Sequence, residues 1–108
     1  MKSLDFKASN IRKAEEYSGK DFFSVFAKVS GGRIAINDLA FLYLCGGLST
    51  GDFDEDFDQT KDMRKVTYHI FESLDEAGFL GEKMNLEAMR EALGLEKASV
   101  KSGEKTKA

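Results

Sequence analysis

The chain has 108 residues, which suits one compact domain and no more, because domains usually contain about 100 to 150 residues. Apolar residues make up 42% of the sequence and charged residues 32%, so the composition is that of a globular protein rather than a disordered one. The net charge of -3, without a cluster of Lys and Arg, argues against nucleic-acid binding, and no apolar run approaches the roughly 18 residues of a membrane span.

Glycine, rather than proline, is expected to end the helices of this chain, because the sequence contains ten Gly and no Pro. Cys45 is the single cysteine, so no internal disulfide can form, and its apolar neighbours indicate a buried thiol. Residues 1–7 lack the continuous apolar core of a secretory signal. We therefore expect a protein of the reducing cytoplasm.

The N-terminal segment predicts a short extended arm followed by a helix. The arm covers residues 4–6. The helix runs from Ser9 or Asn10, either of which can cap it, to Tyr17, and Gly19 ends it.

Two apolar segments follow, and each is closed by a pair of glycines. One helix begins at Asp21, ends at Gly31–Gly32 and has an apolar face made of Phe22, Val25, Phe26 and Val29. Residues 33–36 are expected to be extended. Asn37 is expected to cap the next helix, which runs through Leu44 and is apolar nearly all round, as is typical of a central helix.

The second half predicts an acidic loop and two more helices. Residues 48–59 are expected to form the loop, since five of them are Asp or Glu within a short stretch. A long amphipathic helix from Thr60 to Ala77, closed by Gly78, is indicated by apolar residues three or four positions apart, namely Met63, Val66, Ile70, Leu74 and Ala77. Asn85 is expected to cap a last helix that turns inward Leu86, Met89 and Leu93.

These elements predict an all-α fold, a small bundle of about five short helices with a short N-terminal extended arm. Residues 1–95 are expected to form a single helical domain. Residues 96–108 are rich in Lys, Ser and Gly and cannot bury enough apolar area to offset their ordering entropy. We therefore expect a flexible lysine-rich tail.

The acidic stretch has the alternate spacing of oxygen ligands in a calcium loop, with Asp52, Asp54, Asp56 and Asp58. That loop also needs Gly at its sixth position and Glu at its twelfth. Counting from Asp52, those positions hold Phe57 and Met63. A solvated acidic loop without a metal is therefore favoured. In a further interpretation, Phe53 and Phe57 are exposed among the carboxylates and dock a basic partner.

No residue pattern indicates catalysis or a cofactor. His69 is the single histidine and has no local Cys, Ser or Asp to form a relay. A thiol at Cys45, inside an apolar helix, would have a raised pKa and poor nucleophilicity. Neither glycine pair is followed by the Gly-Lys-Ser/Thr ending of a phosphate loop.

The order of these segments resembles that of the phage tail assembly chaperones of long-tailed bacterial viruses, in phages or prophages. The matching stretches are Ser9 to Glu16, Ser18 to Phe23 and Gly31 to Leu39, the last of which leads into an apolar helix. The acidic stretch, the long helix and a closing segment from Leu86 to Leu95 follow in the same order. The likeness covers about residues 4–95 and rests on order and spacing.

The resemblance implies a small non-enzymatic protein of the host cytoplasm that is absent from the mature virion. It would associate in several copies with the tape measure protein, and with the tail tube protein as a further candidate partner, before the tube polymerises. A longer form is often produced in this family by a translational frameshift. The tail from Lys97 would be the junction at which that form departs.

The residues expected to contact a partner are aromatic or flexible apolar side chains. Phe53 and Phe57 are expected in the acidic loop, and the long helix would supply Met63, Tyr68 and Phe71. In the alternative interpretation, Met63 and Phe71 are core residues. For Phe71 both interpretations stay open, because it is adjacent to Ile70 and only one of two adjacent helix residues is expected to point fully inward.

Two other classes of protein stay open. One is a different phage structural protein, such as a head-tail connector, which would form rings of fixed stoichiometry. The other is a small regulatory interaction module whose acidic loop responds to calcium, for which added calcium should change the melting temperature.

Overall fold

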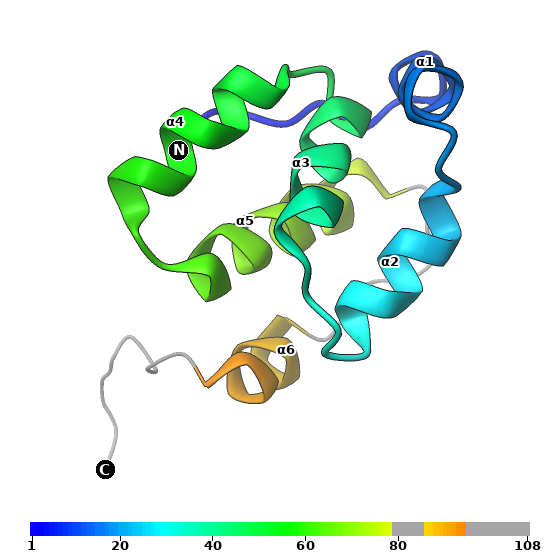
Figure 1. The fold of residues 1–108 in the computed structure, drawn as a ribbon. Helices are drawn as coiled ribbons and strands as arrows, with labels where there is room; N and C mark the ends of the chain where they lie inside the picture. Colours follow the sequence, from blue (N-terminus) through cyan, green and yellow to red (C-terminus); the bar gives the residue numbers. More distant parts are fainter. Residues whose placement is uncertain (79–85, 95–108) are drawn as a thin grey trace, which may run out of the picture.

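The computed structural model describes residues 1–78 and 86–94, and all regular structure in these residues is helical (Figure 1). Six helices are present there: α1 (Ala8–Ser18), α2 (Phe22–Ser30), α3 (Ile36–Cys45), α4 (Thr50–Thr60), α5 (Met63–Ala77) and α6 (Leu86–Leu93). The predicted all-α class is confirmed, with one helix more than the five expected.

Helix α3 is the centre of the bundle. It packs against α1, α2, α4 and α5, and Figure 1 shows it between the α1–α2 side and the α4–α5 side. Six of its ten residues are buried, namely Asp38, Leu39, Phe41, Leu42, Tyr43 and Cys45. Because its residues are apolar on nearly every side, it gains by being covered all round. The prediction of a central helix is confirmed.

The residues before α1 form the expected arm. The Asp5 amide donates to the Gly46 carbonyl at the end of α3, with an N···O distance of 2.7 Å. Phe6 is buried in the core, and Leu4 packs over Gly46 so closely that an added Cβ there would lie 2.5 Å from Leu4 Cδ2. Glycine at position 46 therefore allows the arm to cross the end of α3.

Residues 48–59 do not form a loop, and that prediction is wrong. Most of them belong to α4, which begins with a capping box: the Ser49 hydroxyl accepts from the Asp52 amide at 3.1 Å, and the Asp52 carboxylate accepts from the Ser49 amide at 2.9 Å. A capping box satisfies two amide groups that a helix start would otherwise leave without partners. Asp54, Glu55 and Asp58 are exposed, whereas Asp56 and Phe53 are buried, so the acidic run is the outer face of a packed helix rather than a solvated loop.

The starts of several helices differ from the predictions by a few residues. Helix α5 begins at Met63 rather than Thr60, because Asp62 caps it by accepting from the Arg64 amide at 3.0 Å. Helix α3 begins before the predicted cap, and its N-cap residue is Ala35 rather than Asn37. By contrast, the predicted cap of α2 is confirmed: Asp21 accepts from the Ser24 amide at 3.0 Å.

Glycine ends helices as expected. The residues after α1 and α5 are Gly19 and Gly78, both with a φ of 75°, a backbone conformation that other residues adopt at a cost. Helix α6 packs against α5, and its Leu86 and Leu93 are half-buried against the core. The predicted cap at Asn85, the Met89 side chain and the tail over residues 96–108 lie outside the described residues. None of the described helices combines the length and apolar character needed to cross a bilayer.

Candidate functional site

Two of the five residues predicted to contact a partner belong to the core. Phe53 is 2% exposed, and its ring packs edge-on against Tyr43 with centroids 5.4 Å apart. Phe71 is also 2% exposed and lies edge-on to Phe26 of α2. The expectation that Phe53 is exposed was therefore wrong. So was the expectation that only one of Ile70 and Phe71 points inward, because both are buried.

The other three predicted residues are half-buried. Phe57 lies beside Phe53, with ring centroids 5.7 Å apart, and both Phe57 and Met63 pack against the core. Tyr68, on α5, lines a hollow that faces α6. The five residues therefore do not form one exposed aromatic surface.

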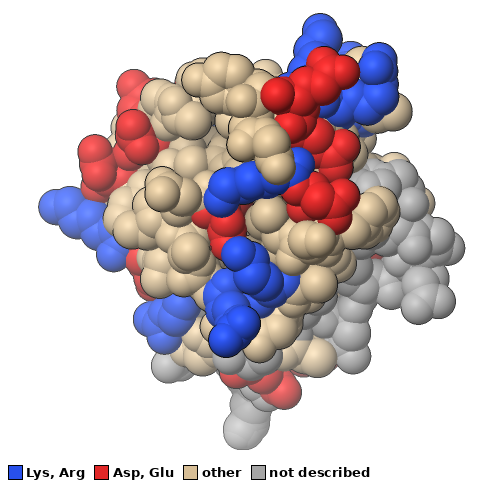
Figure 2. All heavy atoms as spheres, turned by 45° about the vertical axis from the view of Figure 1, so that its right-hand side comes forward, with Lys and Arg blue, Asp and Glu red and all other residues tan. Residues whose placement is uncertain are grey.

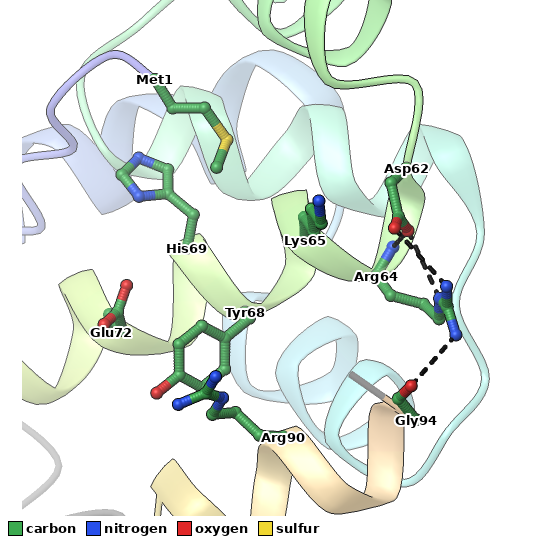
Figure 3. A pocket seen from close by; sticks show the side chains of 9 residues that line it. All are labelled: Met1, Asp62, Arg64, Lys65, Tyr68, His69, Glu72, Arg90 and Gly94. Atoms are coloured by element: carbon green, nitrogen blue, oxygen red, sulfur yellow. Dashed lines mark hydrogen bonds and ion pairs between the residues drawn. The ribbon is translucent and has the colours of Figure 1, made fainter. Parts of the chain in front are cut away.

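The hollow beside Tyr68 is a basin between the N-terminus, α5 and α6 (Figure 3). It encloses about 800 Å³ and carries mixed charges: Arg64, Lys65, Arg90, Asp62 and Glu72. Arg64 Nη1 donates to the Gly94 carbonyl at 3.3 Å, while Arg64 Nε lies 3.3 Å from Asp62 Oδ1. The Arg90 guanidinium lies over the Tyr68 ring, 5.5 Å from its centroid. Arg64 and Arg90 thus link α5 to the α6 region, and Arg64 also pairs with Asp62.

Neither residue considered for catalysis is placed for it. His69 Nε2 lies 2.7 Å from the Lys2 carbonyl oxygen, so the imidazole donates there and holds the arm. Burial, together with the Glu15 carboxylate, raises the pKa of Cys45 to about 12. A thiol with that pKa is a poor nucleophile at neutral pH. In residues 1–78 and 86–94, no three His, Cys, Asp or Glu side chains come together as metal ligands.

A second hollow is an apolar groove between the arm, α1 and α2. It encloses about 280 Å³, and its apolar lining consists of Phe6, Ala8, Ile11, Phe22 and Phe23. Phe22 is buried, whereas Phe23 is 60% exposed, and the two rings meet edge-on with centroids 5.1 Å apart. Phe23 therefore forms a projecting aromatic wall at the solvent edge of the groove. We call this hollow the α1–α2 groove.

Three charged residues also line the α1–α2 groove: Lys7, Arg12 and Glu15. The Glu15 carboxylate accepts a hydrogen bond from the Phe22 amide at 2.8 Å. It thereby satisfies one of the backbone amides that the first turn of α2 would otherwise leave without a partner. The Lys7 ammonium lies 3.5 Å from Asp5, but both side chains are exposed and such pairs contribute little. No ion pair to Arg12 occurs within the described part of the chain.

Helix α2 is held in place on α3 by a buried carboxylate. Asp38 is buried, and its oxygens lie 2.8 Å from Lys20 Nζ and 3.1 Å from Lys28 Nζ. Burial disfavours the charged form, but the hydrogen bond from Lys20 and the ion pair with Lys28 outweigh it, so the pKa of Asp38 lies below its ordinary value of 3.8. This network fixes α2 as one wall of the groove.

The side of the molecule that carries α1 and α2 presents uncharged surface between charged groups. Figure 2 brings this side forward and shows a broad tan surface that is interrupted by separate basic and acidic groups. Two more apolar side chains are exposed on these elements and on α3: Tyr17 is 83% and Ile36 is 52% exposed. Of the large apolar side chains exposed in the described residues, Phe23 is the one that lines an apolar hollow, whereas Tyr17 and Ile36 lie outside it.

The residues predicted to contact a partner do not include Phe23, which the structure shows to be exposed at the edge of the groove. The signal was present in the sequence, because α2 has an apolar face that includes Phe22 and Phe26, and Phe23 lies off that face. A large aromatic residue off the buried face of a short helix is a candidate for partner contact.

Comparisons of the chain with protein-family models, curated proteins and solved structures find no match.

Proposed function

We propose that this chain is a non-enzymatic phage tail assembly chaperone that binds the tape measure protein and keeps it soluble until the tail tube assembles. The single observation that carries the binding role is the α1–α2 groove, an apolar hollow with the exposed Phe23 at its edge. The assignment to tail assembly comes from the resemblance in segment order and spacing.

The groove suits a protein that covers apolar helices. A long helical partner exposes apolar stripes, and an amphipathic helix can lay such a stripe into a hydrophobic groove. Aromatic anchors such as Phe23 contribute much of the binding energy in interfaces of this kind. The exposure of Phe23 does not weaken the core of the protein. The other two phenylalanines of α2 contribute to packing, because Phe22 is buried and Phe26 packs against Phe71 of α5.

The remainder of the proposal follows from the same assignment. The protein acts in the bacterial cytoplasm, in several copies, and is left behind when the virion matures. The tail tube protein is a further candidate partner. We propose that the partner contacts the α1–α2 groove, with Phe57, Met63 and Tyr68 as secondary candidates because they are half-buried rather than core.

Co-expression with the tape measure protein encoded nearby tests the proposal. We expect a larger soluble fraction of the tape measure protein and co-purification of the two chains. Phe23→Ser should reduce both, while Tyr17→Ser, an exposed substitution outside the groove, should not. Failure of the native chain and of any longer frameshifted form to increase solubility would contradict the chaperone function.

A further inference from the structure

We propose that the α1–α2 groove selects an amphipathic helix whose apolar side chains are flanked by acidic residues. This inference rests on the proposed function for the identity of the natural partner, but the chemistry of the groove can be tested separately. Three features of the groove carry it: its size, the fold around it and the charges at its edge.

The size of the groove favours side chains rather than a whole small molecule. It encloses about 280 Å³, at the lower end of the sizes of about 300 to 1,000 Å³ that are usual for small-ligand pockets. Its lining is mainly aromatic and aliphatic, so an occupant gains by burying apolar area. The groove therefore suits one or two large apolar side chains that project from a partner chain.

The surrounding fold favours a helical occupant over an extended one. An extended peptide commonly binds by adding a strand to the edge of a sheet, where unpaired backbone groups receive it. The described residues contain no strand, and the groove is bounded by α1, α2 and the arm. The arm amide at Asp5 is already bonded to the Gly46 carbonyl. A helix, which satisfies its own backbone groups, can enter such a groove with its side chains alone.

The charges at the edge of the groove favour acidic flanks. Arg12 has no ion pair within the described residues, and Lys7 has only an exposed contact to Asp5. The one carboxylate in the lining, that of Glu15, is bound to the Phe22 amide. The groove thus presents basic groups on a chain whose net charge is -3. Acidic residues beside the apolar anchors would pair with these cations, whereas basic residues would meet like charge.

The absence of tryptophan from the sequence gives a direct test, because Phe23→Trp introduces a single indole at the groove. The probes are two synthetic helical peptides of about 18 residues with the same Leu stripe, one flanked by Glu and the other by Lys. We expect a saturable blue shift of the emission with the Glu peptide and an affinity about fivefold to tenfold higher than for the Lys peptide. The preference should shrink in about 0.5 M salt.

Two controls make the result specific. Ile36→Trp places the indole at another exposed site, outside the groove lining, and its emission should not change on peptide addition. Reversing the edge charges with Lys7→Glu and Arg12→Glu should invert the preference between the peptides. Anisotropy of labelled peptides with the native chain measures the same affinities without a new indole.

The outcomes separate this inference from the proposed function. Equal affinity for both peptides, or no saturable binding by anisotropy, would overturn the groove's selectivity. Unimpaired rescue of the tape measure protein by the Phe23→Ser variant would overturn the groove as the site where the natural partner binds, while leaving the chaperone function intact. Selective peptide binding without any rescue would support the groove and contradict the chaperone function.

Discussion

Helices α2 and α4 both carry closely spaced phenylalanines, yet the structure treats them in opposite ways. On α4, Phe53 is buried, although its neighbours in sequence are carboxylates. On α2, Phe23 is exposed, although the residue before it, Phe22, is buried in the core. The difference follows from what lies beside each helix: α4 packs against both α3 and α5, whereas α2 packs mainly on α3. Neighbouring helices, rather than local composition, decide which aromatic residue is covered.

The polar groups of the two regions differ in the same way. At the α3–α4 contact, the buried Asp56 accepts from the Tyr43 hydroxyl at 2.7 Å and from the Lys2 amide at 2.9 Å. Burial disfavours its charged form, but these hydrogen bonds lower the pKa of Asp56 below its ordinary value. At the α1–α2 groove, by contrast, Arg12 and Lys7 face solvent. In the first region the buried polar groups bond to one another within the chain, whereas in the second the basic groups remain exposed.

The largest expected effect is at Phe53. Phe53→Ala should lower the free energy of unfolding by about 3 to 5 kcal/mol, because it removes a buried ring and leaves a cavity beside Tyr43. Urea denaturation followed by circular dichroism measures it. Phe57→Ala, at a half-buried position on the same helix, should cost clearly less. A similar loss for both would show that the α3–α4 contact is not packed as described.

Removing the carboxylate of Asp38 should have the next largest effect. Asp38→Asn should cost about 1 to 3 kcal/mol near neutral pH, because Lys20 and Lys28 lose a charged acceptor. The pKa of Asp38 is lowered on folding, so its contribution is present above the ordinary value of 3.8 and is lost as the pH falls through the folded value.

The stability of the native chain should therefore converge with that of the Asp38→Asn variant in acid. Chemical denaturation at several pH values between about 7 and 3 measures this. Asp54→Asn, at an exposed position on α4, is the matched control and should change little. A difference between the native chain and the Asp38→Asn variant that persists undiminished at low pH would contradict the ion-pair explanation.

Loss of the α4 capping box should have a smaller effect. Ser49→Ala removes the acceptor of the Asp52 amide and should cost about 1 kcal/mol. Thermal denaturation measures it, with Thr50→Ala at the next, exposed position as the control. An unchanged melting temperature would mean that the start of α4 does not depend on this cap.

The smallest expected effect on stability is at Phe23. Phe23→Ala should change the free energy of unfolding by less than about 0.5 kcal/mol, because the side chain is 60% exposed. Phe22→Ala, one residue earlier and buried, should cost several-fold more in the same denaturation experiment. A loss of about 2 kcal/mol or more at Phe23 would show that its ring stabilises the fold and is not free for a partner.

Much of the fold could be predicted from local signals, because the residues that end helices act locally. The glycines after α1 and α5 and the cap at Asp21 lie where the sequence places them. For α4 two local signals conflict. Ser49 and Asp52 have the spacing of a capping box, which predicts a helix, whereas the acidic run that follows favours a solvated loop.

The candidate site could not be predicted in the same way. The wall formed by α2 depends on Lys20 and Asp38, which are 18 residues apart, and the arm is tied down by Lys2 and Asp56, which are 54 apart. No local pattern indicates such pairs. The exposure of Phe23 likewise follows from which helices pack beside α2, and that is a property of the whole bundle.

The crossing of Leu4 over Gly46 has a consequence for the dynamics of the chain. The Asp5 amide makes the backbone bond that joins the arm to α3 there, and Phe6 lines the groove from the same arm. Segments with few such bonds open locally at a lower free energy than the core. Hydrogen exchange at Asp5 should therefore report detachment of the arm separately from global unfolding. Gly46→Ala, which puts a methyl group against Leu4, should accelerate that exchange first.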